Sequence, residues 1–556
     1  MDNTFLTWKF EVKKTIISST IFFSLVLSTL VAPAWAKHKT QKAPPIKCDP
    51  YSNYACFDNY LGKSFGERLW HYYKLEMHHA AAPVDPHAPS SHRAKWPPTP
   101  ESTPPMPFTE WPYGATTPIG VSLPNSADSP FMTSISNTHA GKWLENNHIQ
   151  IYGWANAGAN LSSNSVKPGG NVPIAYMYTP NKVQLDQIVL YAERAPDTVQ
   201  TDHVDWGFRL SALYGENYRY TTAFGILSNQ LLRHNRVNGV DLPMEYAELY
   251  IPRIAEGLVL RLGRYISIPD IEAQLAPNNY MYSHSMTYSF DNYTNEGLVG
   301  SLAVTKNFIV QLGVVEGSDT GFWNAGQKRS NPAPNPLYPH STFLKDPGAK
   351  PSAVACMRYT WNNGNDTFYP CIDGINDGTW GYNNLQWYGF TFYHKFNDKW
   401  HISYEIYQTH QNNVANLNNP IATAAIAAGG TPFSPQYMPY NAPNGAQCSN
   451  PTDLTCTARA LGTVAYINYQ FSPLDNISFR PEYFNDKQGQ RTGTKTRYLN
   501  FGIGWQHWLS PQIELRPEID YDYALDNPAF NGNSNAGIAP NKRYTVMAAM
   551  DIIAHF

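Results

Sequence analysis

The last thirteen residues of the chain, 544–556, constrain the fold more than any other stretch of the sequence. Every second residue from Tyr544 to Phe556 is apolar, whereas the intervening face carries Thr545, Asp551 and His555 beside three apolar residues. Such alternation fits a β-strand with one face in lipid and the other in a polar lumen. It predicts the closing strand of a transmembrane barrel. An ordinary sandwich strand that ends on an aromatic residue by chance is the alternative.

This strand resembles the last strand of bacterial outer-membrane barrels, whose C-terminal aromatic residue is read by the barrel assembly machinery. The resemblance implies that Phe556 serves as an assembly signal and has little part in transport. Deletion of Phe556 should then lower the amount of folded protein in the outer membrane.

The N-terminus has the pattern of a secretory signal peptide. Residues 1–36 combine three lysines, an apolar run over 16–31 and a final Ala34-Trp35-Ala36, which matches a small-x-small cleavage pattern. The run is shorter than the about 20 strongly apolar residues of a spanning helix, and no later apolar stretch reaches about 18 residues. Only helices and closed barrels satisfy the backbone in lipid, so a membrane-spanning form of this chain must use strands.

The composition also favours a barrel. The chain is 42% hydrophobic and 14% aromatic, with 37 Tyr and 15 Trp, yet its mean hydropathy is −0.42. A barrel combines these properties because its polar lumen offsets the lipid face and aromatic girdles mark both interfaces. The net charge of −3 and the pI near 6.6 give no indication of a nucleic-acid partner.

The mature chain before residue 148 does not alternate as a barrel does. Residues 57–79 have helical spacing of apolar residues, which predicts a short helix. Prolines recur through 83–130, and such a segment is expected to be extended because proline cannot pair within a sheet. We expect residues 37–145 to form a periplasmic extension, with a plug in the lumen as the competing interpretation.

Alternating segments fill residues 148–556 and predict an all-β, antiparallel transmembrane barrel of about 16 strands (range roughly 14–18). With both termini in the periplasm, long connections should follow odd strands and tight turns should follow even ones. This rule holds from the ninth expected strand onward and fails before it, so one early strand is expected to be misassigned. The expected strands are residues 148–160, 182–193, 204–214, 218–228, 243–251, 258–265, 280–290, 297–305, 308–316, 384–396, 400–410, 461–471, 477–484, 495–506, 512–523 and 543–556.

Six cysteines fall into three local pairs within segments rich in Asn, Pro and Gly. A zinc site is disfavoured because the sequence has no CxxC and no adjacent Cys–His spacing. Short-range disulfides formed in an oxidising periplasm are the better explanation. The expected pairs are Cys48 with Cys56, Cys356 with Cys371, and Cys448 with Cys456.

Charged residues recur on one face of several expected strands, most clearly on 512–523. A charge facing lipid near mid-bilayer costs about 2–4 kcal/mol for Arg or Lys, so these faces should line the lumen. Mixed signs predict weak ion selectivity, with a slight local preference for cations beside the acidic strip of 512–523. A salt-bridge network that fills the barrel is the alternative. The expected pore-lining residues are Arg209, Arg219, Arg261, Glu405, Arg480, Glu482, Glu514, Arg516, Glu518, Asp520 and Asp522.

Several short motifs occur along the alternating part of the chain. They are IYGWANAG at 151–158, WGFR at 206–209, LYGENYR at 213–219, LGRY at 262–265 and APNNYMYSHS at 276–285. Taken in order, these motifs resemble the OmpL-like β-barrel porin family of Gram-negative bacteria. The resemblance covers about residues 148–556 and implies an outer-membrane barrel with pore activity, but it supplies no substrate and no binding residues. The cysteine-bearing segments after residue 350 look like additions to the family pattern.

No catalytic motif is recognisable in the sequence. Ser283 and His284 are neighbours in an expected strand and would point to opposite faces, so they cannot form a nucleophile–base pair. We therefore expect a non-enzymatic protein without cofactor or metal. The expected function is passive diffusion of small hydrophilic solutes or ions across the outer membrane.

Two alternatives belong to other functional classes. One is a surface-display barrel, an adhesin or receptor, that presents the disulfide-stapled loops. The other is a barrel sheath for a partner protein such as a cytochrome. Outer-membrane lipid, lipopolysaccharide and the barrel assembly machinery are the expected partners in any of these cases, and a homo-oligomer is left open.

Overall fold

The structure is a computed structural model of the chain, and nearly all of the residues that it describes belong to the unit of residues 58–556. The described residues are 54–76, 129–321, 350–376, 385–427 and 445–556, without the short gaps 224, 233, 235, 267–269, 398, 473, 511 and 534–536.

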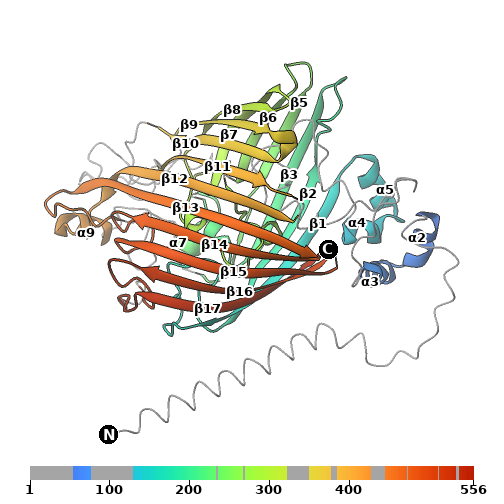
Figure 1. Ribbon diagram of the computed structural model, residues 1–556. Coiled ribbons are helices and arrows are strands. Elements are labelled where there is room, and N and C mark those ends of the chain that lie inside the picture. Colours follow the sequence, from blue (N-terminus) through green and yellow to red (C-terminus); the bar gives the residue numbers. More distant parts are fainter. Residues whose placement is uncertain are drawn as a thin grey trace, which may run out of the picture. The chain divides into compact units, whose positions relative to one another are not determined.

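Seventeen strand segments form one closed antiparallel sheet, the barrel wall of Figure 1. β4 and β5 both pair with β3, so together they make one interrupted strand and the barrel has sixteen wall positions. The segments are β1 Gln150–Ser162, β2 Val183–Arg194, β3 Asp205–Gly215, β4 Gly239–Asp241, β5 Glu245–Ile251, β6 Leu258–Ile266, β7 Thr294–Thr305, β8 Phe308–Val315, β9 Ser352–Trp361, β10 Asp366–Ile375, β11 Gln386–Lys395, β12 Trp400–Ala415, β13 Thr455–Ser472, β14 Asp475–Asp486, β15 Thr496–Ser510, β16 Ile513–Ala524 and β17 Tyr544–His555.

β17 closes the barrel against β1, as the terminal alternation predicts. The N–H of Phe556 donates to the carbonyl of Gly153 at 2.8 Å, and the N–H of Gly153 donates back at 3.0 Å. Figure 1 shows the C-terminus beside the start of β1. The prediction of a closing strand is confirmed, whereas the part of Phe556 in assembly stays a prediction.

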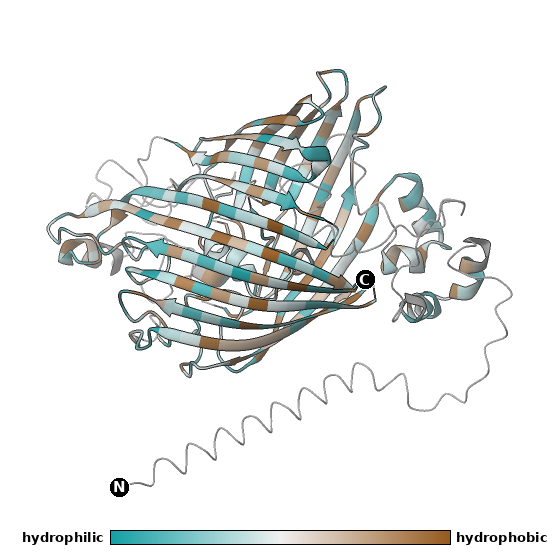
Figure 2. Cartoon of the chain, in the orientation of Figure 1, coloured by the Kyte–Doolittle hydropathy of each residue, from teal (hydrophilic) through white to brown (hydrophobic). Residues whose placement is uncertain are grey.

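The two faces of each wall strand differ in polarity, because successive side chains of a strand point to opposite sides. On β16, Ile519 and Tyr521 are 62% and 40% exposed, whereas Glu518 and Asp520 are 4% and 1% exposed. Figure 2 shows hydrophobic and hydrophilic positions alternating along the wall strands. The apolar side chains therefore face outward and the charged ones face the interior.

Two expected strands are wrong, and two real ones were not expected. Residues 218–228 and 280–290 form no strand, while β9 and β10 lie within residues 317–383, where no strand was expected. Because the two errors cancel, the count of sixteen is right. With the corrected strands, long and short connections alternate around the whole barrel.

The hairpin of β9 and β10 turns at residues that suit a left-handed backbone. Asn362, Asn363 and Gly364 have φ values of 52°, 56° and 88°, a region that Asn and Gly adopt most readily. This Asn-Asn-Gly turn is the sequence signal that could have identified the hairpin.

Two of the three expected disulfides lie within the described residues. Cys356 and Cys371 are directly opposite on β9 and β10, with their Cα atoms 4.2 Å apart. This disulfide therefore joins two wall strands, and the expectation that it staples a loop is wrong. Cys448 and Cys456 pair at a Cα distance of 6.1 Å, between the β12–β13 connection and the start of β13. Cys48 lies outside the described residues, so its pairing with Cys56 stays a prediction.

The expected helix over 57–79 is divided into α2 and α3 by Gly62, whose φ is +92°. α3 begins with a capping box, in which the Ser64 N–H donates to Glu67 Oε2 at 3.1 Å and the Glu67 N–H donates to Ser64 Oγ at 3.3 Å. Arg68 links α3 to α4 through the carbonyl of Thr133. The helical segments are α2 Tyr54–Leu61, α3 Phe65–Glu76, α4 Pro130–Ile135, α5 His139–Asn146, α6 Tyr218–Thr221, α7 Asn229–Leu232, η4 Ala276–Asn278, α8 Met286–Ser289, η5 Asn362–Gly364 and α9 Pro420–Ala427.

Among the residues that the structure describes, no helix is long and apolar enough to cross a membrane. Most of the Pro-rich stretch 83–130 lies outside those residues, and the expected domain boundaries before residue 148 stay predictions.

Candidate functional site

Ten of the eleven expected pore-lining residues lie on wall strands with their side chains buried in the interior. Arg209 is on β3, Arg261 on β6 and Glu405 on β12. Arg480 and Glu482 are on β14. The other five are on β16: Glu514, Arg516, Glu518, Asp520 and Asp522.

Arg219 is the exception. It lies on the short helix α6, in the connection after β3, and is not part of the wall. Its Nη1 donates to the carbonyl of Arg236 at 2.8 Å, and its guanidinium lies 4.4 Å from the ring centroid of Tyr178. The alternation around residue 219 was misleading because the chain leaves the wall at Gly215, at the end of β3.

A long stretch between β6 and β7 fills part of the interior. We call residues 270–293 the internal segment. Every side chain described in it is buried, although it has no strand partner and contains only η4 and α8. A backbone of this kind needs hydrogen-bond partners from elsewhere when it is buried. The charged wall residues supply many of them.

Three wall carboxylates accept hydrogen bonds from backbone N–H groups of the internal segment. Glu405 lies on β12, Glu482 on β14 and Glu518 on β16, so the contacts extend across several wall strands. Charge-assisted bonds of this kind are stronger than neutral ones. The donors are Ile271 to Glu405 at 2.9 Å, Tyr282 and Ser283 to Glu518 at 2.9 and 3.0 Å, and Met286 and Thr287 to Glu482, the former at 3.0 Å.

Three arginines donate to backbone carbonyls of the internal segment. Arg516 and Arg480 reach it from β16 and β14, and Arg491 reaches it from the connection between β14 and β15. The segment is thus held by donors and acceptors together. The bonds are Arg516 to Ala276 and to Asn279 (2.9 Å), Arg480 to Ser283 (2.7 Å), and Arg491 to Phe290 (2.9 Å) and Asp291 (2.8 Å).

The wall charges also pair with one another. In most of these pairs the arginine was expected to line the lumen, but its acidic partner was not identified. Where the two residues lie directly opposite each other, aligning neighbouring strands in register would have identified the acid. Arg209 lies opposite Glu193, Arg261 opposite Glu248 and Arg516 opposite Asp551. The ion pairs are Arg209–Glu193, Arg261–Glu248 (2.7 Å), Arg264–Asp241 (3.0 Å), Arg480–Asp520 (3.1 Å) and Arg516–Asp551.

These contacts correct the expectation that the acidic strip of β16 borders water. Asp520 pairs with Arg480, Asp522 accepts from Asn500 at 2.7 Å, and Glu514 accepts from Gln506 at 2.8 Å. A crevice of about 210 Å³ lies between β14, β16 and the internal segment, and Ser283, Arg480 and Asp520 are among the residues that line it. In this region a network of ion pairs and hydrogen bonds, close to the alternative of a salt-bridge network, describes the wall better than an open lining.

Aromatic side chains join three connections inside the barrel. Tyr176 follows β1, Tyr220 follows β3, and His284 belongs to the internal segment. Tyr176 stacks on Tyr220 with ring centroids 4.5 Å apart and on His284 at 3.7 Å. Burial lowers the pKa of His284 well below its usual range, and its Nε2 donates to the carbonyl of Ala273 at 2.7 Å. Burial therefore favours the neutral form of the ring.

Residues 148–556 match the model of a protein family described as "Putative beta-barrel porin-2, OmpL-like". A search of the curated proteins finds no match. Among solved structures, the chain is similar to the anion-selective porin from Comamonas acidovorans, with a TM-score of 0.41 and 10% identity over 73% of this chain and 99% of that one. It is similar to OprB of Pseudomonas putida, with a TM-score of 0.41 and 12% identity over 77% and 99%. The family match takes in the complete barrel, from β1 to β17.

Proposed function

The chain belongs to the OmpL-like beta-barrel porin-2 family, and from this premise we propose that it is an outer-membrane porin whose passage is narrowed by the internal segment. Passive diffusion of small hydrophilic solutes or ions is the function that fits the fold. The observation that carries the proposal is a closed sixteen-position barrel with a polar interior face. A barrel of this size encloses an aqueous channel unless something occupies it.

The pairing of wall charges supports weak ion selectivity. Strong selectivity needs a ring or row of one sign. Here the arginines of β3, β6, β14 and β16 each have an acidic neighbour, so these arginines present little uncompensated positive charge to a passing ion. We propose that the size of a solute decides whether it passes, because the internal segment occupies part of the lumen that water would otherwise fill.

The remaining expectations extend this proposal. Residues 1–36 direct secretion through the inner membrane, and the apolar outer face contacts lipid and lipopolysaccharide. The assembly machinery reads the strand that ends at Phe556. A sheath for a partner protein is disfavoured, because the internal segment fills space that such a partner would need.

Conductance of the refolded mature protein in a planar bilayer tests the function. We expect discrete, reproducible steps that are small for a sixteen-strand barrel, with a reversal potential near zero in a salt gradient. A silent bilayer after confirmed folding would contradict the porin and favour the display barrel. A large reversal potential would contradict the paired interior.

A further inference from the structure

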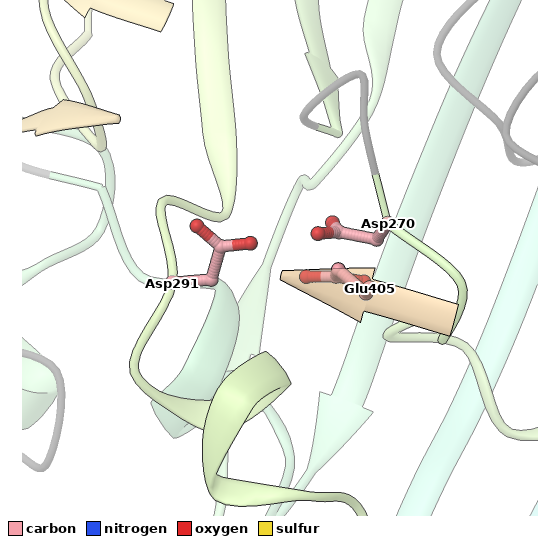
Figure 3. Close-up of side chains that lie close together, drawn as sticks. All are labelled: Asp270, Asp291 and Glu405. Atoms are coloured by element: carbon pink, nitrogen blue, oxygen red, sulfur yellow. The ribbon is translucent and has the colours of Figure 1, made fainter. Parts of the chain in front are cut away.

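Three buried acids meet at the junction of the internal segment and the wall. Asp270 begins the segment, Asp291 lies near its end, and Glu405 projects from β12. One oxygen from each side chain lies within 4.8 Å of the other two. Figure 3 shows the three carboxyl groups turned toward a common space.

Among the described residues, no cation forms an ion pair with Glu405 of β12 or with Asp291 near the end of the internal segment. Asp291 is fully buried and Glu405 is 1% exposed, and neither belongs to an ion pair in the described part of the chain. Arg491 donates to the backbone carbonyl of Asp291 at 2.8 Å. Buried like charges this close repel strongly, so the site needs either bound protons or a cation.

A second observation, separate from the clustering, points to a ligand. Three carboxyl groups can lie close together and still have a donor for each oxygen. Here Oδ2 of Asp291 and Oε1 of Glu405 accept from no N–H or hydroxyl group of the described residues, although both side chains are buried, and the side-chain neighbour of Asp291 is the carboxyl group of Asp270. The side-chain oxygen of the adjacent Asn292 is also buried without a partner. Orphaned buried acceptors are costly, and a bound cation would satisfy them.

The chemistry of these oxygens selects a hard divalent cation. Ca²⁺ is bound by carboxylate and amide oxygens at about 2.3–2.6 Å, so oxygens on opposite sides of one ion lie up to about 5 Å apart. The three side-chain oxygens lie within 4.8 Å of one another, which fits this range. Mg²⁺ usually retains several waters, which suits an enclosed site poorly.

We propose that Asp270, Asp291 and Glu405 bind one Ca²⁺ ion, which joins both ends of the internal segment to β12. Both ends of the segment contribute a ligand, so the ion would fix the loop that narrows the lumen. The sequence alone did not indicate this site, because the three residues are far apart in the chain and share no motif. The proposal does not depend on transport, and its test uses no conductance.

Calcium binding to the full mature protein, refolded in detergent and freed of metal with a chelator, tests the site. Isothermal titration with CaCl₂ should show one saturable site per chain. Asp291→Asn and Glu405→Gln should each weaken it by at least about tenfold. Glu514→Gln, which alters a buried acid of β16 away from the cluster, should bind as the wild type does. Absence of binding, or equal binding in all variants, would overturn the proposal and leave shared protons as the compensation.

A second measurement does not depend on whether the variants fold. Tb³⁺ substitutes for Ca²⁺, and excitation of nearby aromatic rings sensitises its luminescence. Tyr407, two residues from Glu405 and on the same face of β12, is a suitable donor. We expect saturable luminescence from the wild type that Ca²⁺ removes and Mg²⁺ removes only at much higher concentration. No sensitised signal, or equal displacement by Mg²⁺, would refute a calcium site.

Discussion

Replacing residues 271–290 by a short glycine–serine linker is expected to raise single-channel conductance several-fold. The replaced residues lie within the interior and are buried, and a sixteen-strand wall alone encloses an aqueous channel. A short linker is enough, because the carboxylates of Asp270 and Asp291 are within 4.8 Å of each other. The wall carboxylates that lose their backbone donors would be hydrated by the water that enters.

The conductance comparison needs evidence that the variant has folded. Heat-modifiable mobility in gels and an unchanged β-sheet signal in circular dichroism would supply it. A folded variant with the conductance of the wild type would show that the internal segment does not limit the passage.

Arg480→Ala is expected to lower the free energy of unfolding by about 3–5 kcal/mol, the usual cost of removing one partner of a buried ion pair. Arg480 pairs with Asp520 at 3.1 Å, donates to the carbonyl and hydroxyl of Ser283 at 2.7 and 2.8 Å, and lies over the ring of Tyr466. Its loss leaves Asp520 buried without its cation and releases the middle of the internal segment. Urea unfolding in lipid vesicles, followed by tryptophan fluorescence, measures the change.

Arg497→Ala is the matched control. Arg497 also pairs with an aspartate, Asp526 at 2.7 Å, but its side chain is half exposed. Exposed pairs contribute little, because water and salt screen them. We expect no measurable loss of stability. Equal losses in the two variants would show that the Arg480 contacts are not special to the interior.

The sequence predicts the barrel well because a strand between lipid and lumen must alternate in polarity. β17 and β16 have this pattern over their whole length, and their faces are assigned correctly. Residues 280–290 alternate too, yet every side chain there is buried in the interior. A period of two does not distinguish a wall strand from a segment that has polar and aromatic neighbours on all sides. β9 was overlooked for the opposite reason, because a turn-rich neighbourhood concealed its alternation.

The sequence predicts which charged residues face the interior, but it does not predict what their side chains contact. Which residues face inward follows from the strand period, whereas what they contact depends on where a loop folds. Glu518 could not be recognised as an acceptor for the N–H groups of Tyr282 and Ser283, more than 230 positions earlier. Local sequence patterns likewise could not predict that Asp270, Asp291 and Glu405 lie close together.

A cross-link between the internal segment and the wall tests the central claim most directly. A Cβ atom at Gly462, on the interior face of β13, would lie 3.0 Å from Cγ2 and 3.1 Å from Oγ1 of Thr287. Since the Cβ atoms of a disulfide are about 3.8 Å apart, the paired substitutions Thr287→Cys and Gly462→Cys place two thiols within bonding reach. Mass mapping of the folded, unreduced protein should recover the peptide of residue 287 linked to that of residue 462. Both thiols free to react with a bulky maleimide in the folded barrel would contradict the account, because the internal segment would then lie elsewhere.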